Sequence, residues 1–122
     1  MKFTVDKRER LCIFQLDEDK LLSFIAPNLK SELFVLQSEG YKNIILDLRN
    51  VQYIDSSGLS AVLVGNRFCK ESEGTFVLTN LNPHILKLIK ISQLESILNI
   101  VPTLEESIDF VMMEEIDRDL RG

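Results

Sequence analysis

The residues best suited to chemistry form a short polar run, Asp55-Ser56-Ser57-Gly58, followed by Leu59. The run comes after an aliphatic segment and before a stretch with helical spacing, and partners of open α/β sheets gather at such strand ends. A serine hydroxyl there could act as a nucleophile or accept a phosphoryl group. A structural interpretation is equally open, because one Asp or Ser suffices to cap the free N–H groups of a helix.

A hydrolase would need a base for the serine, and the single histidine, His84, could lie at a neighbouring strand end. However, the strained turn that presents a nucleophilic serine requires Gly-x-Ser-x-Gly. Ile54 stands two positions before Ser56, and Asp55 stands two positions before Ser57. The sequence therefore predicts no catalytic residue and no enzyme.

Carboxylates offer a second alternative, a receiver-like phosphoacceptor site built from Asp17, Glu18, Asp19 and Asp47. Such a site requires magnesium and a lysine near the last strand, and residues 97–103 contain no lysine. A glycine-rich phosphate cradle is also missing from the sequence. We therefore expect no metal and no cofactor, and a strand-end or structural role for Asp47.

The elements that must position the polar run follow from apolar periodicity and cap residues. Strands are predicted at 3–5, 11–16, 44–48, 75–79 and 97–101, with helices near 27–39, from about Ser57, from Asn82-Pro83, and from the capping box Thr103–Glu106. This order, ββαβαβαβα, predicts an α/β fold with a mixed, mostly parallel sheet packed by about four helices. Residues 1–113 form one domain, and the charged tail 114–122 either frays or continues the last helix.

Composition fits one ordinary globular domain, with 122 residues of which 45% are hydrophobic and 27% charged. The net charge of −5 and the absence of a basic stripe argue against nucleic acid. No apolar stretch reaches membrane-spanning length and the first residues do not resemble a leader, so we expect a cytoplasmic protein without membrane insertion. Cys12 and Cys69 lack metal or redox spacing and are expected to be buried thiols.

The segments Leu46-Asp47-Leu48 and Ile54–Leu59 closely resemble the signature of STAS domains, the anti-sigma factor antagonists of bacteria. The resemblance covers nearly the whole chain, because the predicted element order also matches. It implies that Ser56 is phosphorylated by a partner that is both anti-sigma factor and serine kinase, and that a serine phosphatase reverses the modification. The unphosphorylated form would bind the anti-sigma factor and free the sigma factor.

We expect the partner to contact Asp55, Ser57, Gly58 and Leu59, together with the exposed face of the second helix, Ser60, Val64 and Arg67. The small size of Ser57 and Gly58 would let the partner approach the acceptor closely. Residues 16–23 differ from the Gly-Glu-Leu-Asp type of turn found in many members of the family, and the carboxylate of Asp17, Glu18 or Asp19 could replace the one in that turn. A STAS scaffold without a phosphorylation cycle, such as a subunit of a lipid-trafficking transporter, is the alternative, and Met112 and Met113 leave a homodimer open.

Overall fold

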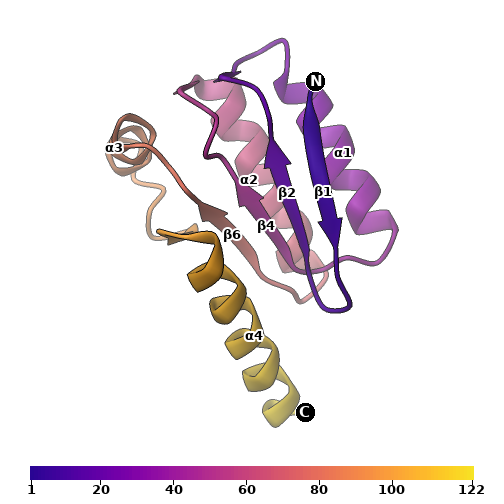
Figure 1. Cartoon of the computed structure of the whole chain (residues 1–122). Helices are drawn as coiled ribbons and strands as arrows, with labels where there is room; N and C mark the ends of the chain where they lie inside the picture. The colour runs from indigo at the N-terminus through magenta and orange to yellow at the C-terminus, as the bar shows by residue number, and fades with distance from the viewer.

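A five-stranded mixed sheet forms the centre of the computed structural model, which describes all 122 residues (Figure 1). The antiparallel hairpin of β1 (Phe3–Lys7) and β2 (Cys12–Leu16) opens the fold, as predicted. The sheet continues in parallel through β4 (Ile44–Asp47), β6 (Phe76–Thr79) and β7 (Asn99–Val101), giving the order β1-β2-β4-β6-β7. The predicted mostly parallel sheet is confirmed.

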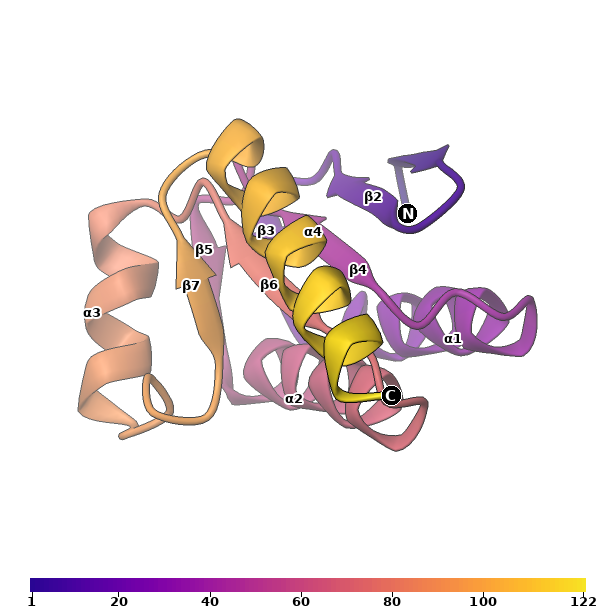
Figure 2. The same ribbon diagram turned by 90° about the horizontal axis from the view of Figure 1, so that it is seen from below.

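Four helices complete the α/β fold (Figure 2). Helices α1 (Ala26–Ser38) and α2 (Ser56–Glu71) cover one face of the sheet, and α4 (Leu104–Arg121) covers the other. Helix α3 (Pro83–Ile91) lies beside β7. No helix is long and apolar enough to cross a membrane.

Alternating side chains in the strands explain why both faces of the sheet are covered. In β4, Ile44 and Leu46 belong to the main core of 23 buried residues under α1 and α2. Ile45 points to the opposite face and joins a second cluster of five buried residues, which includes Val111 of α4. The uninterrupted aliphatic run in this strand thus reflects burial on two sides.

Side-chain caps start three of the helices, and two of these begin where the sequence predicts. Asn82 Oδ1 accepts a hydrogen bond from Ile85 N at 2.8 Å, and Thr103 Oγ1 accepts one from Glu106 N at 3.1 Å. Helix α2 begins at Ser56, one residue earlier than expected, because Asp55 serves as its cap. Asp55 is therefore the residue that fixes where the polar run becomes helical.

Two very short strands were missed by the sequence prediction. β3 (Lys20–Leu21) and β5 (Tyr53–Ile54) pair in parallel as a separate two-stranded sheet. Strands of two residues are too short to show a periodic pattern. Their pairing places the segment that follows β3 beside the start of α2.

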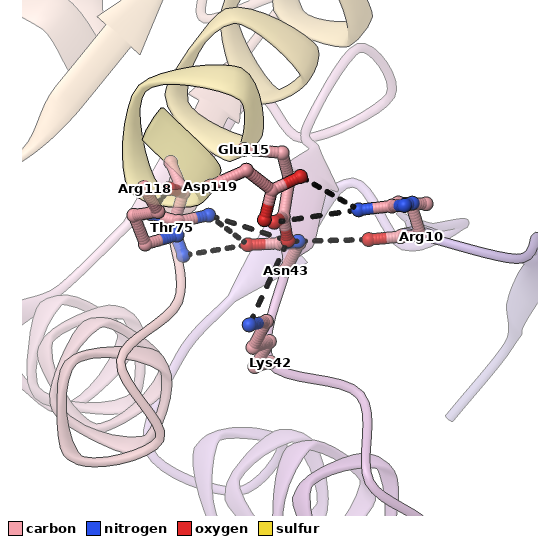
Figure 3. Close-up of polar contacts among 7 residues, drawn as sticks. All are labelled: Arg10, Lys42, Asn43, Thr75, Glu115, Arg118 and Asp119. Carbon is pink, nitrogen blue, oxygen red and sulfur yellow. Dashed lines mark hydrogen bonds and ion pairs between the residues drawn. The ribbon is translucent and has the colours of Figure 1, made fainter. Parts of the chain in front are cut away.

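A group of charged and polar residues, the α4 polar cluster, anchors the C-terminal half of α4 (Figure 3). Glu115 is only 4% exposed and accepts a hydrogen bond from Asn43, and Arg10, Lys42 and Arg118 each form an ion pair with it. Arg118 also donates to Thr75 Oγ1 at 2.9 Å. Helix α4 consequently runs through the charged residues 114–121.

Both cysteines are buried free thiols, as the sequence predicts. Burial raises the pKa of the Cys12 and Cys69 thiols to about 12. Because the thiolate is the reactive form, neither side chain is available for redox or nucleophilic chemistry.

Candidate functional site

Ser56 is exposed at the first position of α2. The capping role belongs to its neighbour, because Asp55 Oδ1 accepts a hydrogen bond from Gly58 N at 2.9 Å. The Ser56 hydroxyl makes no hydrogen bond within the protein, so the structure does not use it to stabilise the helix. The two interpretations of the polar run thus apply to different residues, Asp55 as the cap and Ser56 as an accessible hydroxyl.

The second oxygen of Asp55 ties the site to the segment after β3. Asp55 Oδ2 accepts a hydrogen bond from Ser23 N at 3.2 Å. The same juxtaposition forms a hollow of about 250 Å³ beside Ser56, called here the serine hollow. Its lining is largely polar and consists of Ser23, Ala26, Pro27, Lys30, Ser56, Ser57 and Ser60. Lys30 is the one charged side chain in this lining.

The backbone around Ser56 favours a negative group. The N–H groups of Ser56 and Ser57 lie in the first turn of α2, where no preceding helical carbonyl can accept from them, and no other acceptor in the protein does so. The helix dipole adds partial positive charge at this end. A covalently attached phosphate would therefore find donors at the place where it is formed.

The structure shows a reason within the domain for a glycine at position 58. A Cβ atom at this position would lie 2.3 Å from the backbone oxygen of Leu21 and 2.6 Å from Ile54 Cγ1. Gly58 is buried, and the close approach that it permits is between α2 and β3 within the domain. Leu59 is only 8% exposed and packs in the main core. Within the domain, Gly58 lets α2 approach β3 closely and Leu59 fixes α2 to the core.

The other predicted contact residues lie along one face of α2. Ser60 and Arg67 are exposed and Val64 is half-buried. Val64 and Arg67 line a second hollow, of about 520 Å³, between α1 and α2, which we call the α1–α2 groove. The remaining lining comes from Lys30, Ser31, Phe34, Val35 and Phe68.

Sequence reasoning missed the α1 side of this groove and the aromatic residue near Ser23. Phe34 is 56% exposed and Phe24 is 73% exposed, which is unusual for large apolar side chains. The helical register of α1 places Phe34 away from the buried residues Leu29, Leu33 and Leu36, which are the ones that the sequence pattern identified. Phe34 could have been recognised as the part of the α1 pattern that does not fit its buried stripe.

The residues considered for the alternative chemistries make other contacts in the structure. His84 packs edge-on against the Tyr53 ring, with 6.2 Å between ring centroids, and makes no hydrogen bond to Ser56. Asp47 is fully buried and holds the loop after β4, because it accepts hydrogen bonds from Arg49 N at 3.0 Å and Asn80 Nδ2 at 3.1 Å. Its predicted structural role is confirmed.

The acidic segment after β2 is partly engaged within the domain. Asp17 Oδ1 accepts from Gln15 and Asn50, and Glu18 accepts from Lys2 N at 2.7 Å. Asp19 is exposed, and its backbone oxygen accepts from Gln52 and Tyr53. Of the three carboxylates, Asp19 is the one whose side chain is not used by the fold.

Comparisons with known proteins agree with the fold. The family model described as STAS domain matches residues 2–107. BtrV of Bordetella bronchiseptica, named as a candidate anti-sigma factor antagonist, is 34% identical over 97 residues, covering 80% of this chain and 83% of BtrV.

Solved structures show the same architecture. A crystal structure of a candidate anti-sigma factor antagonist from Thermotoga maritima superimposes with a TM-score of 0.82 at 26% identity, covering 90% of this chain and 94% of that one. The Bacillus cell fate determinant SpoIIAA in its phosphorylated form shares the fold, with a TM-score of 0.71 at 23% identity and coverage of 90% and 99%. With the family model matching most of its length and a relative above 30% identity, this chain belongs to the STAS domain family.

Proposed function

We propose that this protein is an anti-sigma factor antagonist that binds an anti-sigma factor while Ser56 is unmodified and releases it when Ser56 is phosphorylated. The observation that carries the proposal is the Ser56 hydroxyl, which is exposed at the start of α2 and used neither by the helix cap nor by His84. Relatives named as anti-sigma factor antagonists support the role, and SpoIIAA is a protein of this fold with a phosphorylated form. A kinase activity of the partner and a serine phosphatase would complete the cycle.

The proposed modification changes a surface and leaves the fold intact. A phosphoserine adds about −1.5 to −2 charge, and the free N–H groups at the start of α2 can hold it. Asp55 already contributes one negative charge, so an acidic or apolar partner surface would be repelled or would have to desolvate both groups. Shifting a complex from almost fully formed to almost absent requires a difference in affinity of about 5.5 kcal/mol.

The first prediction tests Ser56 directly. Incubation with ATP and a candidate anti-sigma factor kinase should add one phosphoryl group, detected by intact-mass spectrometry, and Ser56→Ala should abolish the gain. Ser56→Asp should raise the Kd for the anti-sigma factor by about tenfold or more, as measured by calorimetry. Its melting temperature should change little, since residue 56 lies at the exposed start of α2 and not in the core.

Ser96→Ala is the matched control, because Ser96 is exposed in the turn before β7 and lines neither the serine hollow nor the α1–α2 groove. It should retain both phosphorylation and binding. An equal mass gain in Ser56→Ala would place the modification elsewhere, and binding without any modification would favour a scaffold role.

The docking surface in this proposal consists of the rim of the serine hollow and the α1–α2 groove, which share Lys30. Large aromatic residues at the centre of an interface contribute most to affinity. We therefore expect Phe34→Ala to raise the Kd for the anti-sigma factor by about tenfold. Ile91→Ala is the control, since Ile91 is 68% exposed but lies on α3. Equal effects of the two substitutions would exclude the groove as the docking surface.

A further inference from the structure

We infer that Lys30 is the internal counter-ion of phosphorylated Ser56, and that this ion pair withdraws the lysine from the α1–α2 groove. The inference rests on the proposed phosphorylation of Ser56 and extends it, because it names the residue through which the phosphate alters the docking surface. The inference follows from the position of Lys30, which lines both hollows, relative to Ser56, which lines one of them.

The position of Lys30 is the first of these observations. Its side chain lines the serine hollow together with Ser56, and it also lines the α1–α2 groove together with Phe34 and Val64. Lys30 is half-buried, as is usual for a lysine whose aliphatic stem packs against the protein while its ammonium reaches water. One long, flexible side chain therefore serves two adjacent surfaces.

The charge environment is the second observation. Lys30 forms no ion pair within the protein, whereas Lys7 pairs with Glu39 and Lys42 pairs with Glu115. The other ionisable group beside Ser56 is Asp55, whose two carboxylate oxygens already accept from Gly58 N and Ser23 N. A phosphate on Ser56 would thus meet one free cation and one engaged anion.

The groove provides the reason why moving this cation affects a partner. The second cation of the groove, Arg67, has Glu71 as a neighbour at 3.9 Å. Lys30 is therefore the groove's unneutralised positive charge, and in the unmodified protein it can pair with a carboxylate of the docked partner. Phosphorylation supplies a competing dianion within the same molecule, which neutralises Lys30 before a partner arrives.

The test installs phosphoserine at position 56 of the full chain during translation, so that no kinase is needed. The second pKa of the phosphate, ordinarily about 6, is then measured by ³¹P NMR. We expect this pKa to be about 0.5 unit lower with Lys30 present than in Lys30→Met, and to be restored by Lys30→Arg. The difference should shrink at 1 M salt.

Lys87→Met is the matched control, because Lys87 is an exposed lysine on α3 and should leave the phosphate pKa unchanged. Melting curves confirm that each variant is folded, and Lys30→Gln replaces Lys30→Met if the latter does not fold. Equal phosphate pKa values with and without Lys30 would overturn the inference. Because the phosphoserine is installed during translation, that result says nothing about whether a kinase phosphorylates Ser56, and the proposed function would remain. Failure of the kinase assay alone would not affect the inferred ion pair.

Discussion

Replacing Glu115 with alanine is expected to lower the free energy of unfolding by about 3 kcal/mol, which corresponds to a fall in melting temperature of about 10 °C. Glu115 is buried and accepts a hydrogen bond from Asn43, and its removal leaves Arg118 without its carboxylate. The value lies at the low end of the range for broken buried pairs, because Arg10 and Lys42 reach solvent. Chemical denaturation of both proteins measures the difference.

The contribution of Glu115 to the free energy of unfolding should change with pH in a defined direction. Burial alone raises the pKa of Glu115, but the hydrogen bond from Asn43 and the charges of Lys42 and Arg118 outweigh it, so the folded-state pKa lies below the ordinary 4.5. A lowered folded-state pKa stabilises the protein above pH 4.5, and this contribution is lost as the pH falls through the folded-state value. The stability difference between wild type and Glu115→Gln should therefore narrow below pH 4.5.

Glu114→Ala provides the control for Glu115, since it removes the neighbouring carboxylate of the same helix, which has no ion pair. Its effect should stay within about 0.5 kcal/mol. If Glu115→Ala lowered the free energy of unfolding as little as Glu114→Ala does, the α4 polar cluster would contribute nothing to stability.

Replacing Gly58 with valine is expected to cost about 3 kcal/mol of stability, at the upper end of overpacking effects. The added Cβ would overlap with the backbone oxygen of Leu21, which cannot move without breaking the β3–β5 pairing. Loss of this pairing would also displace Ser23 from Asp55 and open the serine hollow. The measurement is a thermal or denaturant unfolding curve of the isolated protein.

Ser60→Val tests whether a branched side chain near the start of α2 is harmful in itself. Ser60 is exposed two residues further along the helix, so this variant should lose little stability. If Gly58→Val melts with the wild type and impairs only partner binding, Gly58 would belong to the docking surface, as the sequence suggested, and the packing explanation would be wrong.

The main features of the fold could be predicted from sequence because they rest on local signals. The aliphatic run at Ile44–Leu46 indicates a strand buried on both faces, and Asn82-Pro83 and Thr103 mark helix starts through their side-chain oxygens. The polar run at residues 55–58 was recognisable for the same reason, since a cap must precede the helix. These patterns need no knowledge of distant contacts.

The remaining parts of the site depend on contacts between distant segments. Lys30 and Phe34 look like ordinary residues of an amphipathic helix, and only the tertiary packing of α1 against α2 places Lys30 beside Ser56. Likewise, nothing in the sequence near Glu115 indicates that its carboxylate will be buried against Asn43, which is 72 positions away. Such residues acquire their roles from the tertiary structure.

The two chain ends lie at opposite ends of the sheet (Figure 1). Because β1 is antiparallel to β2, the N-terminus lies near the acidic segment, where Lys2 N donates to Glu18, whereas α4 carries Gly122 away toward the amino ends of the parallel strands. For laboratory work, this makes the C-terminus the suitable attachment point for an affinity tag, a fluorophore or a sensor surface. A label joined to Met1 would lie beside the acidic segment, whose Glu18 accepts a hydrogen bond from Lys2 N.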